Sequence, residues 1–389
     1  MHLKHISILN FKNIGEFEAD FSPRFNCFLG DNGVGKTNLM DAIYYLSFTK
    51  SHFNAIDRQT IRHGEEMFVL QGRYDIKGEK VNVVCGLKRH SKKQVKRDGK
   101  QYDKFSEHIG LLPLVFITPS DTEIIHLGSE LRRKYLDGVI SQYDKYYLQQ
   151  LIQYKRALEQ RNALLKKLSP ENPYDEDALM IWDERLVSAG TYIHQKRREA
   201  VEALVPIFNR YYEIISSDAE QVSINYKSGL FEKPLEQLLK DNRQRDLYLR
   251  HTTAGTHRDD LDFELNGYPL KKTGSQGQEK TLIIALKLAQ FDFIHQTVDV
   301  RPLLLLDDVF DKLDAQRINQ LVNLLSDDNY GQVFFSDTSR ERLPGLLKHI
   351  DVDVRIFNVE NQNPKTNDDQ NINDNSAGAD SPAESEGTE

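Results

Sequence analysis

A short segment that is rich in glycine and ends in lysine and threonine, GDNGVGKT, occupies residues 30–37. An apolar stretch precedes it and a helical pattern follows it, which is the context that a phosphate-binding loop needs. In such a loop, backbone N–H groups turn toward phosphate oxygens, the lysine reaches the β- and γ-phosphates, and the threonine hydroxyl binds Mg²⁺. We therefore expect ATP and Mg²⁺ to contact the whole segment: Gly30, Asp31, Asn32, Gly33, Val34, Gly35, Lys36 and Thr37. The alternative is a glycine-rich turn in which the lysine is accidental.

Two aspartates follow a second apolar stretch, LLLLDD, at residues 303–308. The four leucines predict a buried strand of a parallel sheet, and the carboxyl ends of such strands are where the sites of α/β proteins lie. Asp307 is predicted to hold Mg²⁺ together with Thr37. Asp308 is predicted to polarise the attacking water and, with Lys36, to be catalytic; because it is shorter than the glutamate often found there, we expect slow hydrolysis. The alternative is a strand that ends in a solvated acidic turn.

A polar turn, GSQGQ at residues 274–278, runs into a segment that is apolar on nearly every side and leaves only Lys287 and Gln290 as expected surface positions. Such a helix is buried, and the N–H groups at its N-terminus can bind an anion. The turn resembles the signature turn of ABC-class ATPases, which binds the γ-phosphate held by a second subunit. The resemblance implies that Ser275, Gly277 and Gln278 contact the ATP of a partner chain. The alternative is an ordinary helix cap, because serine is a preferred cap residue.

The elements that must position these residues change character along the chain. Residues 1–118 are predicted to be mostly strands and to form the N-terminal part of an ATPase head. Residues 119–218 contain two long helical runs, separated by SPENPYD, which predict an antiparallel arm; the second run is predicted from residue 176 to about residue 215. Residues 219–358 return to strands and helices, complete the head, and include a segment after the acidic strand in which Ser336, Asp337 and Thr338 are phosphate-contact candidates. The fold class is therefore α/β, an ABC/SMC-like ATPase head with an inserted helical arm.

The last segment, residues 359–389, is acidic and contains few apolar side chains. Eight acidic residues and one lysine between positions 360 and 389 account for −7 of the net charge of −8, so the rest of the chain is nearly neutral and can present a basic face. We predict that the tail is disordered. No apolar run is long enough to span a membrane, and the N-terminus lacks a secretion signal. Cys27 and Cys85 lie in apolar stretches and are predicted to be reduced thiols of a cytoplasmic protein.

Five segments together resemble the RecF family, bacterial ATPases of DNA replication and repair. The resemblance runs in order through residues 10–53, 116–137, 253–267, 274–290 and 303–314. Its most specific parts are THRDD at residues 256–260 and the Arg132–Arg133 pair. The resemblance implies an ABC/SMC-like head with a short arm, ATP-dependent dimerisation, weak DNA-stimulated ATP hydrolysis and DNA binding. It also implies work with RecR and RecO at stalled forks and single-strand gaps, as part of the response to DNA damage.

Other ATPases share parts of this pattern. The ATPase subunit of a membrane transporter would carry the three ATP motifs but would lack THRDDL and the long arm. A long coiled-coil chromosome ATPase needs hundreds of heptad residues, and a zinc-hook ATPase of DNA-break repair needs C-x-x-C; neither occurs here. A small-molecule kinase would not carry the turn at Ser275.

A cluster of basic residues lies in a predicted hairpin, LKRHSKKQVKRDGK, that turns at Asp98–Gly99. Basic side chains along one edge of a hairpin can contact DNA phosphates without reading the base sequence. The candidates for DNA contact are Lys88, Arg89, Lys92, Lys93, Lys96, Arg97 and Lys100, with Arg132, Arg133, Lys155 and Arg156 of the arm as weaker candidates. The alternative is a solvated hairpin that carries a run of charge.

Overall fold

The N-terminal strands form an antiparallel sheet whose side chains alternate between buried and exposed, as in a sheet with one face on the core. The strand order is β2-β1-β4-β5-β6-β7, with β1 at His2–Phe11, β2 at Ile14–Asp20, β4 at Met67–Ile76, β5 at Glu79–Lys88, β6 at Gln94–Arg97 and β7 at Lys100–Gln101. Asp98 and Gly99 have φ angles of 50° and 82°, which suits a tight hairpin turn. The predicted turn at this dipeptide is therefore confirmed.

A second sheet is parallel, and four of its five strands are buried throughout, which explains their continuous apolar sequences. The strand order is β14-β3-β13-β12-β8, with β14 at Val354–Asn358, β3 at Phe25–Leu29, β13 at Val333–Asp337, β12 at Leu303–Asp307 and β8 at Leu114–Ile117. The register places Asp307 opposite Ser336 and Asp337 opposite Leu29. The segment after β3 and the aspartates after β12 therefore meet at one edge of the sheet.

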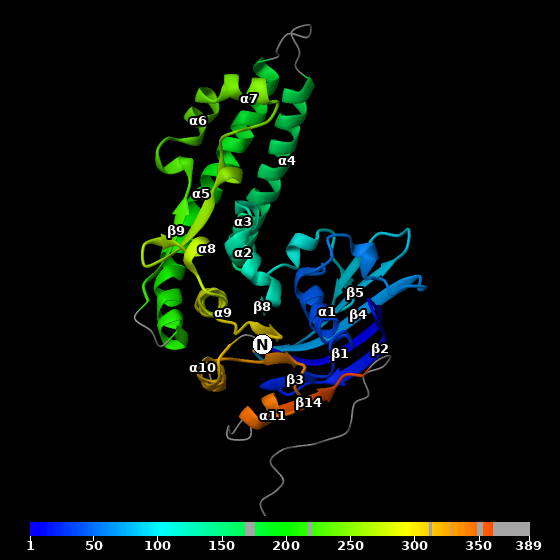
Figure 1. Cartoon of the computed structure of the whole chain (residues 1–389). Coiled ribbons are helices and arrows are strands. Elements are labelled where there is room, and N and C mark those ends of the chain that lie inside the picture. The colour runs from blue at the N-terminus through cyan, green and yellow to red at the C-terminus, as the bar shows by residue number, and fades with distance from the viewer. Residues whose placement is uncertain (168–175, 217–219, 311–312, 328, 348–352, 361–389) are drawn as a thin grey trace, which may run out of the picture.

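Helices cover both faces of the parallel sheet (Figure 1). On one face, α1 (Lys36–Phe48) packs between the parallel sheet and the antiparallel sheet, in one core with Leu303 and Leu305. On the other face, α9 (Gln276–Val298) packs against β8 and shares the second core with Leu304 and Leu306. Alternate leucines of β12 thus contact opposite cores, and α10 (Ala315–Ser326) lies below α9 in the view of Figure 1.

The inserted segment forms an arm that projects from the head (Figure 1). Its helices are α3 at Ser129–Ile140, α4 at Lys145–Lys167 and α5 at Glu176–Ser216. Figure 1 shows α4 and α5 side by side, with α6 (Leu235–Asp241) and α7 (Arg243–Leu249) beside the far end of the arm. A three-stranded sheet in the order β11-β10-β9 packs against α5, with β9 at Val222–Lys227, β10 at Asp260–Leu265 and β11 at Tyr268–Pro269. The remaining helices are short: α2 at Glu123–His126, α8 at Leu270–Thr273 and α11 at Arg342–Leu347.

Ion pairs join the arm helices α3 and α5 to each other and to the residues at the start of β10. Arg197 of α5 is 3% exposed, and its guanidinium donates to Asp137 of α3 at 2.9 Å and to Asp259 at 2.8 Å. Arg132 of α3 makes a two-pronged contact with Asp260, at 2.6 and 3.0 Å. The Arg132–Arg133 pair and the THRDD block, which carried the resemblance to the family, therefore contact each other where α3 meets the start of β10.

This computed structural model describes the chain except for residues 168–175, 217–219, 311–312, 328, 348–352 and 361–389. Of the segment 359–389 that was predicted to be disordered, residues 361–389 lie outside the described residues. Its predicted start is wrong, because Val359 is buried and its backbone N–H donates to the Leu29 oxygen at 2.7 Å, which continues the pairing of β14 with β3. Within the described part the predicted α/β architecture is confirmed, including the second helical run, predicted over residues 176–215 and found at Glu176–Ser216. Cys27 and Cys85 are buried free thiols, as predicted. Among the described helices, none is both long and apolar enough to cross a membrane.

The predicted surface positions of α9 are wrong. Lys287 and Gln290 are each only 7% exposed. The Lys287 ammonium lies 2.7 Å from the Asp121 carboxylate and donates to the backbone oxygen of Phe116 at 2.8 Å. A cation that finds a carboxylate and a carbonyl inside the protein can be buried at a tolerable cost in free energy. The helix is therefore buried on this side as well.

Candidate ATP-binding site

In the predicted phosphate loop between β3 and α1, the lysine side chain is bound by backbone oxygens of the loop itself. Gly35 has a φ angle of 115°, a conformation that favours glycine, and leads directly into α1. A Cβ atom at this position would lie 2.9 Å from Nδ2 of Asn13, so the turn between β1 and β2 supports the loop. Lys36 is 4% exposed, and its Nζ donates to the backbone oxygens of Gly30 at 2.7 Å and Asp31 at 2.9 Å. A positive charge is thus fixed at the N-terminus of a helix, a position that attracts phosphate.

A carboxylate and two hydroxyl groups meet at the edge of the parallel sheet. Thr37 Oγ1 donates to Asp307 Oδ2 at 2.8 Å, and Ser336 Oγ donates to Asp307 Oδ1 at 2.6 Å. Burial raises the pKa of the Asp307 carboxyl, although the hydrogen bonds from Ser336 and Thr37 and the nearby Lys36 ammonium oppose this effect. The structure therefore brings together the two predicted metal-binding residues. It also identifies Ser336 as the residue of the segment 336–338 that contacts Asp307.

This group of oxygens fits Mg²⁺. Magnesium prefers hard oxygen ligands and is usually bound by one or two carboxylates together with phosphate oxygens and water. A cation beside Asp307 would also offset the cost of keeping a buried carboxylate ionised. Thr37 and Asp307 are therefore suited to hold the metal, with Ser336 orienting the carboxylate.

Asp308, the predicted catalytic carboxylate, has an unusual backbone conformation. Its φ angle is 44°, in the left-handed region, which for a residue other than glycine costs on the order of 1–3 kcal/mol. Its backbone N–H donates to Ser336 Oγ at 2.9 Å. Ser336 thus contacts both aspartates and helps to hold Asp308 in this strained conformation. Strain of this kind concentrates at functional sites, which agrees with a role for Asp308 in the chemistry.

The polar turn before α9 is a well-formed helix cap that faces solvent. Ser275 Oγ accepts from the backbone N–H of Gln278 at 3.2 Å, and the Gln278 side chain accepts from the backbone N–H of Ser275 at 2.7 Å. In the described structure no hydrogen bond or ion pair joins residues 274–278 to the phosphate loop of the same chain. The cap interpretation is thus confirmed as local structure. A contact with a second chain's ATP is compatible with this cap and stays a prediction for Ser275, Gly277 and Gln278.

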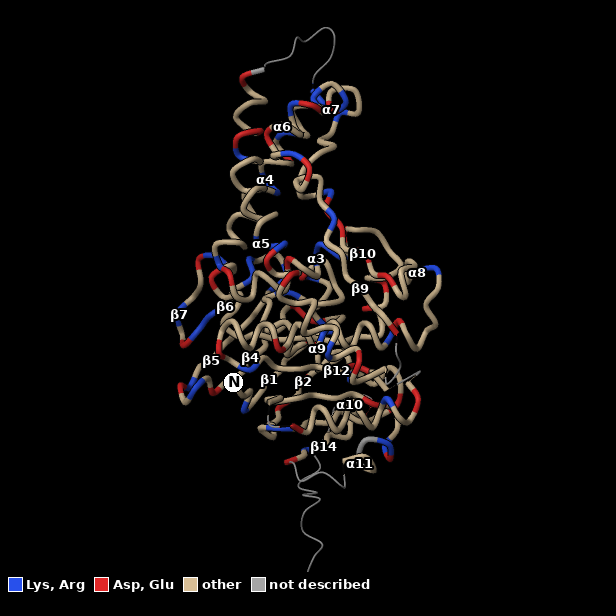
Figure 2. Tube along the Cα trace, turned by 90° about the vertical axis from the view of Figure 1, so that its left-hand side faces the viewer, with Lys and Arg blue, Asp and Glu red and all other residues tan. Residues whose placement is uncertain are grey.

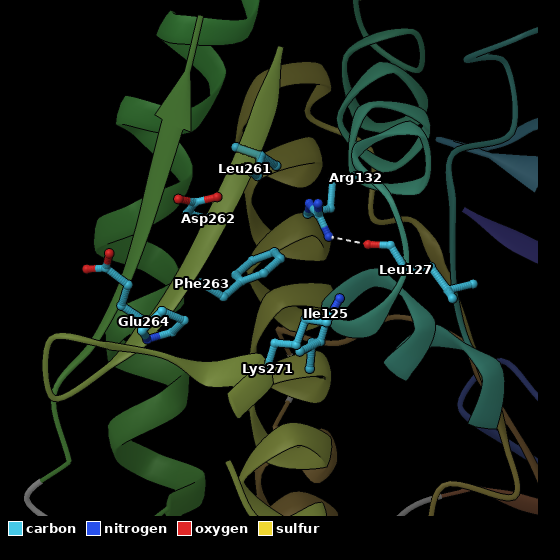
Figure 3. Close-up of a pocket in the computed structure, with 9 residues that line it drawn as sticks. Ile125, Leu127, Arg132, Leu261, Asp262, Phe263, Glu264 and Lys271 are labelled. Carbon is cyan, nitrogen blue, oxygen red and sulfur yellow. Dashed lines mark hydrogen bonds between the residues drawn. The ribbon is translucent and has the colours of Figure 1, made fainter. Parts of the chain in front are cut away.

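A cavity of about 160 Å³ lies next to the arm rather than at the phosphate loop (Figure 3). Its walls combine apolar and charged side chains: Ile125, Leu127, Leu261, Phe263 and Pro269 line it together with Arg132, Asp262, Glu264 and Lys271. Arg132 is also bonded to the backbone oxygen of Leu127 at 2.7 Å, so it is engaged by the protein and is a poor candidate for DNA contact. Arg133 likewise donates to the backbone oxygen of Asp259 at 2.7 Å.

The residues of the basic hairpin that were predicted to contact DNA differ in solvent exposure and in their partners. Lys88, Lys92 and Lys100 are exposed, and Lys96 and Arg97 are half-buried. Figure 2 shows basic positions at the edge formed by β6 and β7, which contain Lys96, Arg97 and Lys100. The structure gives Lys93 a different role: its ammonium lies 2.6 Å from the Asp57 carboxylate and donates to the backbone oxygen of Thr49 at 2.6 Å. Arg89 donates to the backbone oxygen of Glu65 at 2.8 Å. An acid from another loop, which the local sequence does not reveal, accounts for the burial of Lys93.

Comparisons with known proteins show the family of the chain. The family model of the RecF/RecN/SMC N-terminal domain matches residues 2–363. The DNA replication and repair protein RecF of Bacteroides thetaiotaomicron is 50% identical over 361 residues, which cover 92% of this chain and 97% of that protein. A solved structure of the recombination mediator protein RecF-ATP in the RecFOR pathway is 31% identical, with a TM-score of 0.82, over 92% of this chain and 95% of the other. The Smc head domain of Pyrococcus furiosus, 16% identical with a TM-score of 0.56 over 94% of this chain and 95% of the other, shares the fold alone.

The residues that the family model matches include the phosphate loop, the acidic strand and the capped turn, and the solved RecF structure shares the fold of the whole head. A relative that is half identical over nearly its whole length shares the arm as well as the head. The chain therefore belongs to the RecF family of DNA replication and repair proteins, with an ABC-like, ATP-binding head.

Proposed function

We propose that the protein is an ATP-dependent DNA-binding clamp of recombinational repair and replication, in which two copies close on each other when ATP binds. It hydrolyses ATP slowly, with stimulation by DNA, and acts with RecR and RecO to help load recombinase at single-strand gaps and stalled forks. Family membership supports the process, and the relative described as a recombination mediator in the RecFOR pathway supports the partners.

The observation that carries the proposal is the position of the Ser275 turn. It is exposed, and within the described structure the N–H groups of Gln276 and Gly277 at the start of α9 donate to no acceptor. Helix termini with such groups attract anions. Because no contact links the turn to its own phosphate loop, a second chain is the source of the anion that this head type would bind. Two such chains related by a twofold axis form two equivalent sites, each from one loop and one turn.

The residues around Asp307 suit slow hydrolysis of ATP. Lys36 supplies a point charge to the β- and γ-phosphates. Thr37 and Asp307 would hold Mg²⁺, which neutralises charge on the phosphates when it is bound. Asp308, fixed through its backbone N–H, orients and polarises the attacking water. Because its carboxylate is one methylene shorter than that of glutamate, turnover is expected to be slow.

The basic residues of the hairpin are proposed to bind DNA through its phosphate backbone, without reading the base sequence. Lys96, Arg97 and Lys100 lie in β6 and β7 at one edge of the antiparallel sheet, Lys88 is the last residue of β5, and Lys92 lies in the loop between β5 and β6. Lysine and arginine in such an arrangement neutralise phosphates and release counterions, so the affinity falls as salt rises. This edge therefore suits DNA of any sequence.

Ser275→Arg tests the clamp. The variant keeps its own phosphate loop, so monomers are expected to bind ATP with near wild-type affinity. A bulky cation in the turn is expected to prevent ATP-dependent dimerisation, measured by analytical ultracentrifugation, and to lower hydrolysis. Lys36→Ala is the complementary variant, because it is expected to lose ATP binding while keeping the turn.

Mixing the two variants gives the decisive measurement. Each mixed dimer contains one intact loop from the Ser275→Arg chain and one intact turn from the Lys36→Ala chain, so partial recovery of hydrolysis is expected. A Ser275→Arg protein that dimerises normally with ATP would reduce the turn to a plain helix cap and remove the main support for the clamp.

A further inference from the structure

The basic hairpin of residues 87–100 carries lysines that no acid of the described structure neutralises. Lys93 is paired with Asp57, and Arg97 lies 3.4 Å from Asp98. Within the described residues, no ion pair involves the other four lysines of the hairpin, which are Lys88, Lys92, Lys96 and Lys100. Unpaired charges of one sign raise the local potential and attract a polyanion. The hairpin therefore suits an acidic partner.

The opposite edge of the same sheet is acidic. β2 is the first strand of this sheet and β7 is the last. Glu16, Glu18 and Asp20 of β2 are exposed. Glu18 and Asp20 lie beside the His5 ring and keep exposed fractions of 66% and 69%. An acidic segment is therefore repelled at the edge formed by β2 and attracted at the edge formed by β6 and β7.

The last described residues lie on the β2 side of the head. Val359 is buried, and its backbone oxygen is so close to Gly30 that a Cβ atom there would be 2.4 Å away. Arg355 of β14 donates to the backbone oxygen of Asp20 at 2.8 Å, which places β14 beside β2. Residues 361–389, which we call the acidic segment, therefore follow a strand that ends between the phosphate loop and β2.

Charge is distributed unevenly along the acidic segment. Residues 361–367, NQNPKTN, contain one lysine and no acid, and seven acids follow from Asp368 to Glu389, so one positive and seven negative charges give a net charge of −6. The five strand spacings from β2 to β7 amount to about 24 Å, and the nine residues 360–368 can span about 30 Å when extended. The acids of the segment thus begin at the chain length needed to reach the basic hairpin.

We propose that the acidic segment docks on the basic hairpin and competes there with DNA. The inference rests on the proposed DNA contact and adds its regulation by a part of the same chain. A tethered segment acts at an effective concentration on the order of 1 mM, so weak ion pairs suffice to occupy the lysines when DNA is absent. Duplex DNA has one negative charge per about 1.7 Å of its axis, whereas the segment has seven acids in its last 22 residues, so DNA displaces it. Docking therefore disfavours weak contacts with DNA more than contacts held by the whole clamp.

Docking is tested on the full-length chain without DNA or ATP. A carbodiimide joins a lysine to a carboxylate only where the two are in contact, and mass spectrometry identifies the joined residues. Crosslinks are expected between the acidic segment and Lys92, Lys96 or Lys100, and they are expected to be lost at about 1 M salt, where the Debye length is about 3 Å. Lys233 and Lys240, exposed lysines near the end of the arm, are the control and are expected to form none with the segment. Absence of the hairpin crosslinks, or equal crosslinking of the control lysines, would overturn the inference.

Competition is tested by removing the segment. A chain that ends at Glu360 keeps the buried Val359 and its pairing with β3. We expect it to bind duplex DNA at least about threefold more tightly than the full-length chain at low salt, because an occupant at about millimolar effective concentration is lost. A full-length chain in which the seven acids are changed to asparagine or glutamine is expected to behave in the same way. Unchanged affinity in both variants would overturn the inference.

Repulsion between the segment and DNA, without docking, would also be relieved by its removal. The two causes are separated in a chain with Lys92→Gln, Lys96→Gln and Lys100→Gln, in which the docking site is gone and removal of the segment is expected to give no gain in affinity. An equal gain in this chain would show repulsion alone and would overturn the inference. If the lysine changes weaken DNA binding but no crosslinks form, only the inference fails; if they leave DNA binding unchanged, the proposed DNA contact itself fails and the competition with it.

Discussion

Ser336→Ala is expected to weaken Mg²⁺-dependent ATP binding, although the motifs alone did not distinguish Ser336 from its neighbours. The side chain is fully buried, donates to Asp307 at 2.6 Å and accepts from the backbone of Asp308 at 2.9 Å. A hydrogen bond to a charged group contributes about 1.5–3 kcal/mol. Loss of the bond to Asp307 is therefore expected to raise the Mg²⁺ concentration at half-maximal ATP binding about 10- to 150-fold, since about 1.4 kcal/mol corresponds to a tenfold change.

Mg²⁺ binding at Asp307 is also expected to depend on pH in a definite direction. Burial raises the pKa of Asp307, and the hydrogen bond from Ser336 opposes that rise. Mg²⁺ requires the ionised carboxylate, so its binding weakens as pH falls through the folded-state pKa, and in Ser336→Ala this loss begins at a higher pH. The folding stability of the metal-free protein changes with pH in the opposite direction. Because the Asp307 pKa is higher in the folded than in the unfolded state, its contribution to stability is present below the unfolded-state pKa and is lost as pH rises through the folded-state pKa.

Titration of a fluorescent ATP analogue with Mg²⁺ across a pH series measures both effects. Ser326→Ala is the matched control, because its hydroxyl bonds the Val322 backbone oxygen at 2.7 Å in the last turn of α10, away from the phosphate loop. A Ser336→Ala protein with the wild-type Mg²⁺ midpoint and pH profile would refute the assignment of the metal to Asp307.

Asp308→Asn is expected to bind ATP like wild type and to hydrolyse it more slowly, because only the polarisation of water is lost; wild-type turnover in a steady-state phosphate assay would assign that role elsewhere. Reversal of Lys92, Lys96 and Arg97 to glutamate is expected to weaken duplex DNA binding and to reduce the salt slope by about 0.9 for each DNA phosphate that the variant no longer neutralises. The control is the same charge reversal at Lys233 and Lys240, which are exposed residues near the end of the arm. An unchanged salt slope in the hairpin variant would mean that the hairpin is solvated and does not contact DNA. Arg197→Met is expected to destabilise the protein by about 3–5 kcal/mol in denaturant unfolding, because it leaves Asp137 and Asp259 buried without their cation. Arg198→Ala, next in sequence but half-exposed, is expected to cost about 0–1 kcal/mol, and similar losses in the two variants would contradict the importance of burial.

The parts of the site that were predictable are those in which function is encoded locally. A phosphate loop needs glycines, a lysine and a threonine at fixed spacing between a strand and a helix, so Lys36 and Thr37 could be assigned from neighbouring residues alone. The same holds for Asp307 and Asp308, because a run of leucines predicts a buried parallel strand and the residues after it lie at the sheet edge. The helices of the arm followed from long periodic segments and a proline-containing break, and α5 ends within one residue of the predicted position.

The residues that were not predictable depend on contacts between distant segments. Lys92 and Lys93 have the same side chain and are adjacent, yet only Lys93 meets an acid, Asp57, which is 36 residues away in the sequence. Lys287 was expected at the surface because lysine usually is, and it is buried because Asp121 lies across from it. A charged side chain is solvated or buried according to its partner, and the partner is set by the fold rather than by neighbouring residues.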